Sequence, residues 1–225
     1  KKAFRKQSEA SFYNTEKIIS NHPNHKVYVS ILDHLVPSLG FMLEERFRIN
    51  ILKEKLHELK LRPGPWLTKF KQAIYEDKED TELIVVKQEG IEKQVEKCFT
   101  LRELKQNIAK ITSGTRIVYL TDIVGSEANI EQIVKDFGYC DVLFIEAGFL
   151  AADKDYAKRT FHLTTMEAGR IAGLLGAKHL HIFHHSFRYK GKDAVLLDEV
   201  LRAYRAFCKE RALSRESLEG SKGIC

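Results

Sequence analysis

An α/β fold is the class that this sequence predicts, and the arrangement of its apolar segments predicts it. Segments 115–124 (TRIVYLTDIV) and 140–149 (CDVLFIEAGF) are nearly continuous apolar runs, which is typical of strands buried on both faces. A helix-like segment lies between them at 127–137, and strands continue to alternate with helices up to about residue 190. Such alternation is typical of a layered sheet with helices packed against it.

Composition and charge restrict the class of protein further. The chain has 225 residues, of which 44% are hydrophobic and 30% are charged, as in ordinary globular domains. No apolar run approaches the ~20 residues that cross a membrane. The cysteines are scattered without a C-x-x-C pair, which argues against a zinc ribbon or a disulfide framework and predicts a cytoplasmic protein. The net charge of +6 is compatible with a nucleic-acid partner without specifying one.

The even composition predicts one domain over 26–213, between an irregular lead-in of residues 1–25 and a tail of residues 214–225. At its start, β-branched residues predict a strand over 26–34, followed by a turn at Pro37 and a second strand. Apolar residues at helical spacing then predict a helix over 50–61. The prolines of RPGPW end that helix because they remove backbone donors.

The middle of the chain carries clear turn and capping signals. Two strands are expected on either side of a turn at Gly90. Thr100 and Glu103 have the spacing of a capping box, which predicts a helix over 101–111. A last amphipathic helix carries an apolar stripe from Leu197 to Cys208.

Side chains suited to metal binding stand at the ends of predicted strands. The segments VYVSILDH, IVYLTD and HLHIFH end at His34, Asp122 and His184, and His162 stands just before a predicted helix capped by Thr164. In layered α/β proteins, function gathers where strands end. Taken singly, each histidine is more often a hydrogen-bonded structural residue, and the aspartate is more often a turn former or helix cap. The residue pattern alone leaves both interpretations open.

The segments around these residues resemble the ribonuclease Z branch of the metallo-β-lactamase fold. The resemblance rests on ordered motifs, namely DHLVPSLGF, RPGPW, VYLTDIV, DVLFIEAGF, HLTT and FHHSFRY. They extend over about residues 26–190. The resemblance implies a metallo-β-lactamase-like αββα sandwich.

The resemblance also implies a set of metal ligands. His34, Asp122 and His184 are expected to bind zinc, with Asp122 bridging two ions of the intact enzyme. His185 stands where the family has an apolar residue, so it is an alternative ligand to His184. The register of the following SFRY favours His184.

Other residues receive roles in the chemistry from the same resemblance. His162 is expected to stabilise the transition state or to protonate the leaving oxygen, and Glu146 to orient it. Arg188 is expected to pair with a substrate phosphate, because a guanidinium fork matches its oxygens. A structural ion pair is an equal alternative for Arg188.

The chain also departs from the family. The H-x-H-x-D-H motif that supplies further ligands is absent, and HPNH at 22–25 has neither its spacing nor its aspartate. The αββα sandwich is therefore expected to be incomplete on its N-terminal side, either because the chain is a fragment or because a stretch is omitted. This chain alone is expected to be inactive. The flexible arm that grips transfer RNA in some members has no recognisable counterpart in the sequence.

The leading hypothesis is a zinc-dependent phosphodiesterase or endoribonuclease that resembles ribonuclease Z. Its expected partner is RNA, with precursor transfer RNA as the specific case, or else a smaller phosphodiester; a homodimer and the absence of a membrane partner are further expectations. The alternative is a metal-free, non-catalytic relative that binds nucleic acid or a partner chain. A nucleotide-binding domain ranks last, because VGSEAN is a poor substitute for a glycine-rich phosphate loop.

Overall fold

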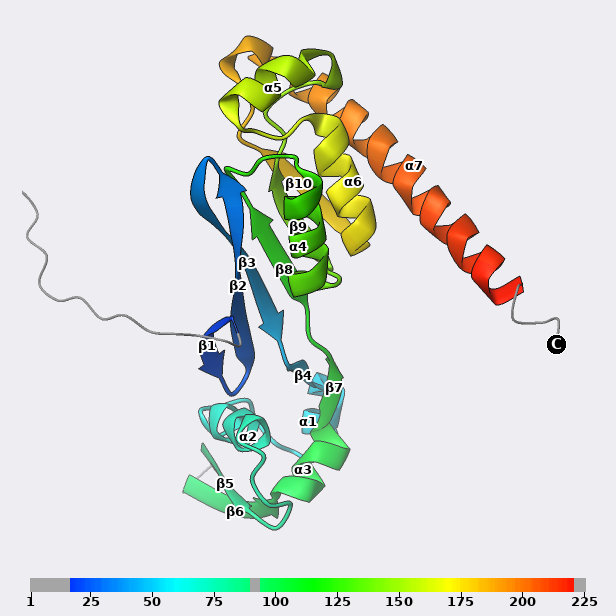
Figure 1. Cartoon of the computed structure of the whole chain (residues 1–225). Helices are drawn as coiled ribbons and strands as arrows, with labels where there is room; N and C mark the ends of the chain where they lie inside the picture. Colours follow the sequence, from blue (N-terminus) through cyan, green and yellow to red (C-terminus); the bar gives the residue numbers. More distant parts are fainter. Residues whose placement is uncertain (1–16, 90–93, 221–225) are drawn as a thin grey trace, which may run out of the picture.

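The computed structural model describes residues 17–89 and 94–220. Within them, a six-stranded sheet has helices over one face, and residues 47–113 form a smaller unit that projects from one end of this sheet (Figure 1). This arrangement confirms the predicted α/β class. None of the helices in the described part of the chain is long and apolar enough to cross a bilayer.

The large sheet has the strand order β1-β2-β3-β8-β9-β10. Its strands are β1 (Ile18–His22), β2 (His25–His34), β3 (Val36–Glu45), β8 (Arg116–Leu120), β9 (Val142–Glu146) and β10 (His179–Phe183). The pairs β8–β9 and β9–β10 are parallel, while β3 runs antiparallel to both β2 and β8. Strand β2 therefore runs parallel to β8. The carboxyl ends of β2, β8, β9 and β10 consequently meet at one edge.

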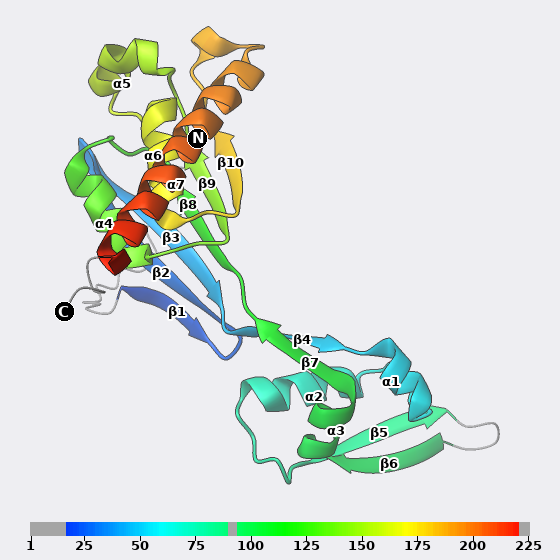
Figure 2. The same ribbon diagram turned by 90° about the vertical axis from the view of Figure 1, so that its right-hand side faces the viewer.

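One face of the sheet is covered by helices (Figure 2). They are α4 (Glu127–Phe137), α6 (Thr165–Leu175) and α7 (Asp193–Gly220), with α7 packed on α6. The core between sheet and helices is apolar, and Leu120, Ile133, Ile145 and Ile171 are completely buried in it. Above the carboxyl edge lie the short helix α5 (Lys154–Thr160) and the 3-10 turns η1 (Ala151–Asp153) and η2 (Phe187–Tyr189).

The opposite face of the sheet is apolar, and within the described residues no helix lies over it (Figure 1). Side chains alternate along a strand, so the neighbours of the buried residues point to this face. Ile31, Leu39 and Tyr119 are exposed there by 68%, 45% and 42%. The described residues thus contain one sheet and one helical layer of the sandwich that the resemblance implies.

The projecting unit has a two-stranded stalk and an apolar core of its own. The stalk pairs β4 (Phe47–Ile51) with β7 (Ala109–Ser113). Beyond it lie α1 (Lys53–Glu58), α2 (Trp66–Tyr75), the hairpin strands β5 (Leu83–Glu89) and β6 (Gln94–Thr100), and α3 (Leu101–Ile108). Phe70, Leu101, Leu104 and Ile108 are completely buried in its core. The domain limits of 26–213 stay a prediction, and within them the described residues form separate apolar cores.

Several elements of this unit differ from the sequence prediction. The helix expected over 50–61 is divided into the end of β4 and the short helix α1, because Ile49 and Ile51 pair with β7. The helix expected over 101–111 ends at Ile108, and strand β7 begins at the next residue. Pro65 also marks the start of the next helix. It is the N-cap of α2, where the missing backbone N–H removes no hydrogen bond of the helix.

Smaller differences concern the start of the chain and the hairpins. The segment 1–25, expected to be irregular, includes β1, which pairs with β2. The turn expected at Pro37 lies at Leu35, whose φ of 63° reverses the chain between β2 and β3. The turn expected at Gly90 lies outside the described residues. The capping box of Thr100 and Glu103 is confirmed.

Candidate active site

Four polar side chains converge at the carboxyl edge of the large sheet. Asp122, Glu146, His162 and His184 each present one nitrogen or oxygen atom, and these atoms lie within 4.8 Å of one another. Asp122 follows β8, Glu146 ends β9, His162 precedes α6 and His184 follows β10. They meet because the parallel strands β8, β9 and β10 all end at this edge.

Glu146 is the buried centre of this cluster. Its side chain is completely buried. Its carboxylate accepts hydrogen bonds from the backbone N–H groups of Asp122 (3.1 Å), Ile123 (3.3 Å) and Leu163 (3.1 Å), and it lies 3.0 Å from Nδ1 of His162. An ionised carboxylate only accepts hydrogen bonds, so Nδ1 of His162 carries the proton of this contact. Glu146 therefore connects the loops after β8 and before α6, and it leaves Nε2 of His162 for other partners.

His34 lies next to His162 at the end of β2. The centroids of the two rings are 4.9 Å apart. Nδ1 of His34 is 2.7 Å from the carbonyl oxygen of Phe161. Because a carbonyl only accepts, Nδ1 donates this bond and Nε2 keeps its lone pair.

Asp122 and His184 are the accessible members of the cluster. Each side chain is 43% exposed, and Nδ1 of His184 lies 3.6 Å from Oδ1 of Asp122. The hydroxyl of Thr121 lies 3.3 Å from the same Nδ1, a contact that the sequence analysis missed although Thr121 stands inside the VYLTD motif. Their exposure leaves both side chains free to bind a ligand, unlike Glu146.

The backbone around the cluster is strained. Leu35, Asp122, Phe161 and His184 have φ values of 63°, 51°, 63° and 58°, in the left-handed region that residues other than glycine seldom adopt. Each such residue costs on the order of 1–3 kcal/mol. Asp122 and His184 belong to the cluster, while Leu35 and Phe161 adjoin His34 and His162 in the sequence. Strain of this kind concentrates at functional sites, where it directs side chains that a relaxed turn would point elsewhere.

Two further residues considered in the sequence lie outside the cluster. Nη1 of Arg188 is 2.9 Å from Asp153, and its guanidinium lies over the ring of Tyr156 at 4.1 Å. Arg188 is thus held in an ion pair, the structural alternative left open by the sequence. Nδ1 of His185 is 3.0 Å from the carbonyl oxygen of Ala147, so His184 and not His185 enters the cluster.

The donor types of the cluster fit zinc. Imidazole nitrogen and carboxylate oxygen are ordinary zinc ligands, and a zinc ion takes about four of them. The side chains of Asp122 and His184 are partly exposed and make only long hydrogen bonds to the hydroxyl of Thr121, at 3.4 and 3.3 Å, whereas the oxygens of Glu146 are already engaged by backbone N–H groups. His34 stands beside the cluster with its Nε2 available. These residues fit part of a zinc coordination shell and leave further ligands to be supplied.

Comparison with known proteins places the chain among relatives named ribonuclease Z. It is 30% identical to that of Deinococcus radiodurans over 199 residues, which cover 88% of this chain and 55% of the relative. It is 32% identical to that of Geobacillus kaustophilus over 183 residues, which cover 81% of this chain and 52% of the relative. The chain therefore spans about half the length of the curated relatives that it matches. No family model matches it.

A solved structure is also similar to the described fold. It is the metallo-beta-lactamase fold protein YhfI from Bacillus subtilis, with a TM-score of 0.47 and 14% sequence identity. The match covers 90% of this chain and 53% of YhfI.

Proposed function

Because this chain is related to the ribonuclease Z proteins of the metallo-β-lactamase fold, we propose that it supplies part of the active site of a metal-dependent phosphodiesterase that cleaves RNA. The observation that carries the proposal is the convergence of Asp122, Glu146, His162 and His184 at one sheet edge. A buried carboxylate, two imidazoles and an accessible carboxylate are the parts that phosphodiester hydrolysis needs.

Asp122, His184 and His34 are the residues we assign to metal binding. Asp122 would hold the metal through its carboxylate, and His184 and His34 would hold it through imidazole nitrogens. When bound, the zinc ions would supply an activated water and neutralise the charge of the phosphate oxygens. The remaining ligands would come from a part of the intact protein other than this chain.

His162 is the residue we assign to proton transfer, with Glu146 as its positioning residue. The contact of Glu146 with Nδ1 fixes the ring and directs Nε2 away from the buried carboxylate. A proton on Nε2 would then pass to the oxygen that leaves the phosphorus atom. The burial of Glu146 excludes water from this contact, so the ring keeps its orientation during the reaction.

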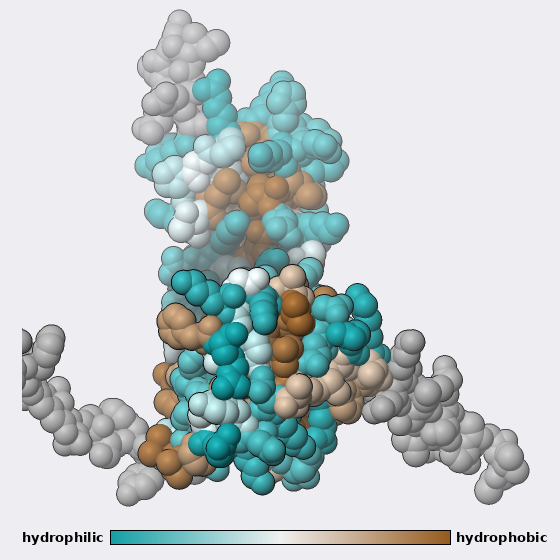
Figure 3. Space-filling model, turned by 90° about the horizontal axis from the view of Figure 1, so that it is seen from above, coloured by the Kyte–Doolittle hydropathy of each residue, from teal (hydrophilic) through white to brown (hydrophobic). Residues whose placement is uncertain are grey.

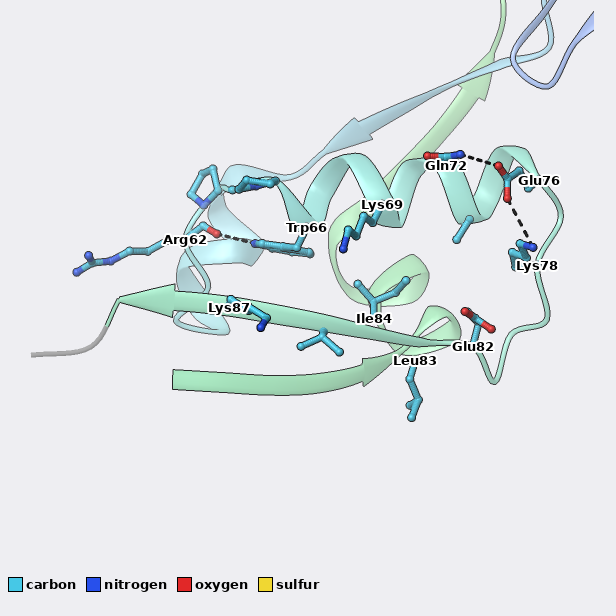
Figure 4. A pocket seen from close by; sticks show the side chains of 15 residues that line it. Arg62, Trp66, Lys69, Gln72, Glu76, Lys78, Glu82, Leu83, Ile84 and Lys87 are labelled. Carbon is cyan, nitrogen blue, oxygen red and sulfur yellow. Dashed lines mark hydrogen bonds and ion pairs between the residues drawn. The ribbon is translucent and has the colours of Figure 1, made fainter. Parts of the chain in front are cut away.

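RNA is the substrate class that we favour, with the 3′ end of precursor transfer RNA as the specific case. The projecting unit of residues 47–113 supports a large substrate. A cleft of about 810 Å³ lies between α2 and β5 in this unit (Figure 4). Basic Arg62 and Lys69 line it together with acidic Glu76 and Glu82, and the buried ring of Trp66 forms part of its wall. Lysine and arginine side chains along a groove attract the phosphate backbone of a nucleic-acid strand. We propose this unit as the counterpart of the transfer-RNA-gripping arm.

The experiment uses the longest natural form of the protein that contains this chain. The 3′-extended precursor transfer RNA is incubated with the protein, with or without a zinc chelator, and the products are separated on a denaturing gel. We expect cleavage that the chelator abolishes and added zinc restores. Cleavage that persists in the chelator would contradict the metal-dependent mechanism.

A metal-free binding protein is the other candidate, favoured by the absence of H-x-H-x-D-H from this chain. It predicts an intact protein that binds the RNA in a gel-shift assay, contains no zinc and leaves the RNA uncut. A protein that hydrolyses bis-p-nitrophenyl phosphate but neither binds nor cleaves the RNA would keep the hydrolase class and exclude the RNA substrate.

A further inference from the structure

Phe187 is an exposed aromatic residue close to the candidate active site. Its side chain is 92% exposed, the largest exposure among the large apolar residues that the structure describes. It follows His184 by three residues and opens the turn η2. Its ring is thus fully available for contact with another molecule.

The backbone that carries Phe187 is firmly anchored. The N–H of Ser186 donates to the carbonyl of Gly148 at 3.0 Å, and the N–H of Tyr189 donates to the carbonyl of Ser186 at 2.9 Å. Tyr189 is buried, and its hydroxyl bonds to Asp153 and accepts the N–H of Leu150. The ring of Phe187 therefore projects from a fixed base, and little conformational entropy is lost when a ligand covers it.

This base adjoins the cluster itself. A Cβ atom on Gly148 would lie 3.5 Å from Cβ of His162 and 3.6 Å from the carbonyl oxygen of His184. Gly148 thus contacts both histidines on one side and holds Ser186 on the other. A polymer whose reacting phosphate lay at the cluster would reach Phe187 with a neighbouring residue.

Basic residues lie close to Phe187 in the sequence and on the helix that adjoins its turn. Lys190 and Lys192 follow it in the chain, and Lys154, Lys158 and Arg159 lie on the adjoining helix α5; all are exposed. Among the described residues, neither Lys190 nor Lys192 takes part in an ion pair. Seen from above, this end of the molecule is mainly hydrophilic, with apolar side chains in small separate groups (Figure 3). An aromatic ring among free cations is typical of a surface for single-stranded nucleic acid.

We propose that Phe187 stacks on a base of single-stranded RNA next to the phosphodiester held at the cluster, while Lys190 and Lys192 contact the flanking phosphates. The assignment deepens and rests on the proposed ribonuclease function. The proposal concerns this chain and not the family motif. Phe187 stands between the motif residues Ser186 and Arg188, at a position that the motif leaves variable. Stacking accepts any base, so the interaction would select single strands without selecting a sequence.

Binding to RNA tests the proposal without any need for catalysis. The probe is a 5′-fluorescein-labelled single-stranded RNA of about ten nucleotides, and its anisotropy is measured against the 225-residue chain. We expect Phe187→Ala to raise Kd by about 5- to 150-fold, as loss of one stacked base does. Phe187→Trp should restore the affinity. On a base-free phosphodiester of equal length, wild type and Phe187→Ala should bind equally.

Tyr139→Ala is the matched control, because Tyr139 is 55% exposed but precedes β9 at the opposite edge of the sheet. It should leave Kd unchanged. Replacement of Lys190 or Lys192 by Gln should each reduce the slope of log Kd against log salt by about 0.7. Phe187→Ala should leave that slope unchanged, because stacking releases no counterions.

Two results would overturn the proposal. The first is an unchanged or undetectable RNA affinity in wild type and Phe187→Ala alike. The second is a Phe187→Ala variant that dissociates an oligomer in sedimentation without changing the RNA affinity, since Phe187 would then contact a second copy of the chain. If Phe187 governs RNA affinity but the intact protein cleaves no RNA, the proposed function fails and the stacking surface stands. If the intact protein cleaves RNA and Phe187→Ala changes neither binding nor cleavage, the proposed function stands and the stacking surface fails.

Discussion

Glu146 is the residue on which the geometry of the candidate active site depends. Its carboxylate is completely buried, and every hydrogen bond that it accepts comes from a loop or side chain of the site. A buried charge is costly unless it is fully paired, and here backbone N–H groups and His162 pair it. The same bonds that stabilise the carboxylate therefore position Asp122 and His162.

We predict that Glu146→Gln destabilises the 225-residue chain. The amide would present an NH₂ group to backbone N–H donors that now bond to oxygen, which leaves buried donors without acceptors. The free energy of unfolding should fall by about 2–4 kcal/mol in urea denaturation. The control is Glu127→Gln, which removes an ion pair with Arg170 where the Glu127 side chain is 65% exposed. Its unfolding midpoint should stay unchanged, and an equal effect of both substitutions would contradict the account of Glu146.

At the scale of elements, helix α6 depends on close packing against α7. Gly169 faces the backbone of α7, where a Cβ atom would lie 2.5 Å from Cβ of Ala203 and 2.6 Å from the carbonyl oxygen of Val200. At Gly173 the nearest atom would be Cβ of Phe207, at 2.9 Å. Since His162 stands directly before α6, the position of this helix also sets the position of the histidine.

We predict that Gly169→Ala destabilises the protein although alanine is the better helix former. Overpacking should cost about 1–3 kcal/mol and exceed the gain of up to about 1 kcal/mol from helix propensity. Gly173→Ala should cost less, because its contact is longer. Thermal unfolding followed by circular dichroism measures both changes. A Gly169→Ala variant that is more stable than wild type would refute the close approach of the two helices.

Local signals allowed the elements with local causes to be predicted. The capping box of Thr100 and Glu103 specifies the start of α3, and Thr164 specifies the start of α6 in the same way. The stalk could not be predicted, because Ile49 and Ile51 have helical spacing to later leucines, and only pairing with the distant strand β7 makes them a strand. Long-range pairing overrides local propensity in such segments.

At the scale of the whole molecule, the large sheet is held at the edge opposite the site by Asp141. Its carboxylate bonds to Nζ of Lys178 at 2.7 Å and to the N–H of Arg116 at 2.8 Å. These partners stand at the starts of β10 and β8, so one side chain connects the three parallel strands. The hydrogen bonds from Lys178 and from the backbone of Arg116 lower the pKa of Asp141.

We predict that the protein loses stability in acid through Asp141. A carboxylate whose pKa is lower in the folded state stabilises the protein above the pKa of the unfolded state, about 4. This contribution is lost as the pH falls through the folded pKa. The free energy of unfolding should therefore decrease below about pH 4, and it should decrease less steeply in Asp141→Asn. Identical pH dependence of both proteins would contradict the role of Asp141.

The exposed apolar face of the sheet affects the behaviour of the 225-residue chain in solution. Ile31, Leu39 and Tyr119 are exposed on it. We predict that the chain on its own binds 8-anilinonaphthalene-1-sulfonate and self-associates in sedimentation. Ile31→Lys together with Tyr119→Lys should reduce both, because burial of this face drives them. A monomeric chain without dye binding would show that this face is stable in water.

The strand ends offered Asp122, His162 and His184 as candidates and the resemblance added Glu146, but neither gave the geometry of the cluster. Asp122 and His184 could be located because strand ends gather at one edge. The role of each residue in the cluster could not be predicted in the same way. The backbone bonds that occupy Glu146 and the ion pair that holds Arg188 depend on contacts between distant segments. His184 enters the cluster and its neighbour His185 does not. The backbone of His184 has the left-handed conformation.

We assign Asp122 to metal binding and His162 to proton transfer. The most direct test is the zinc content of the intact protein, measured by mass spectrometry of wild type, Asp122→Ala and His162→Ala, together with turnover. We expect about two zinc ions per wild-type chain, loss of metal and activity together in Asp122→Ala, and a His162→Ala variant that keeps its zinc but turns over slowly. Equal loss of zinc in both variants, or a wild-type protein without zinc, would contradict the assignment.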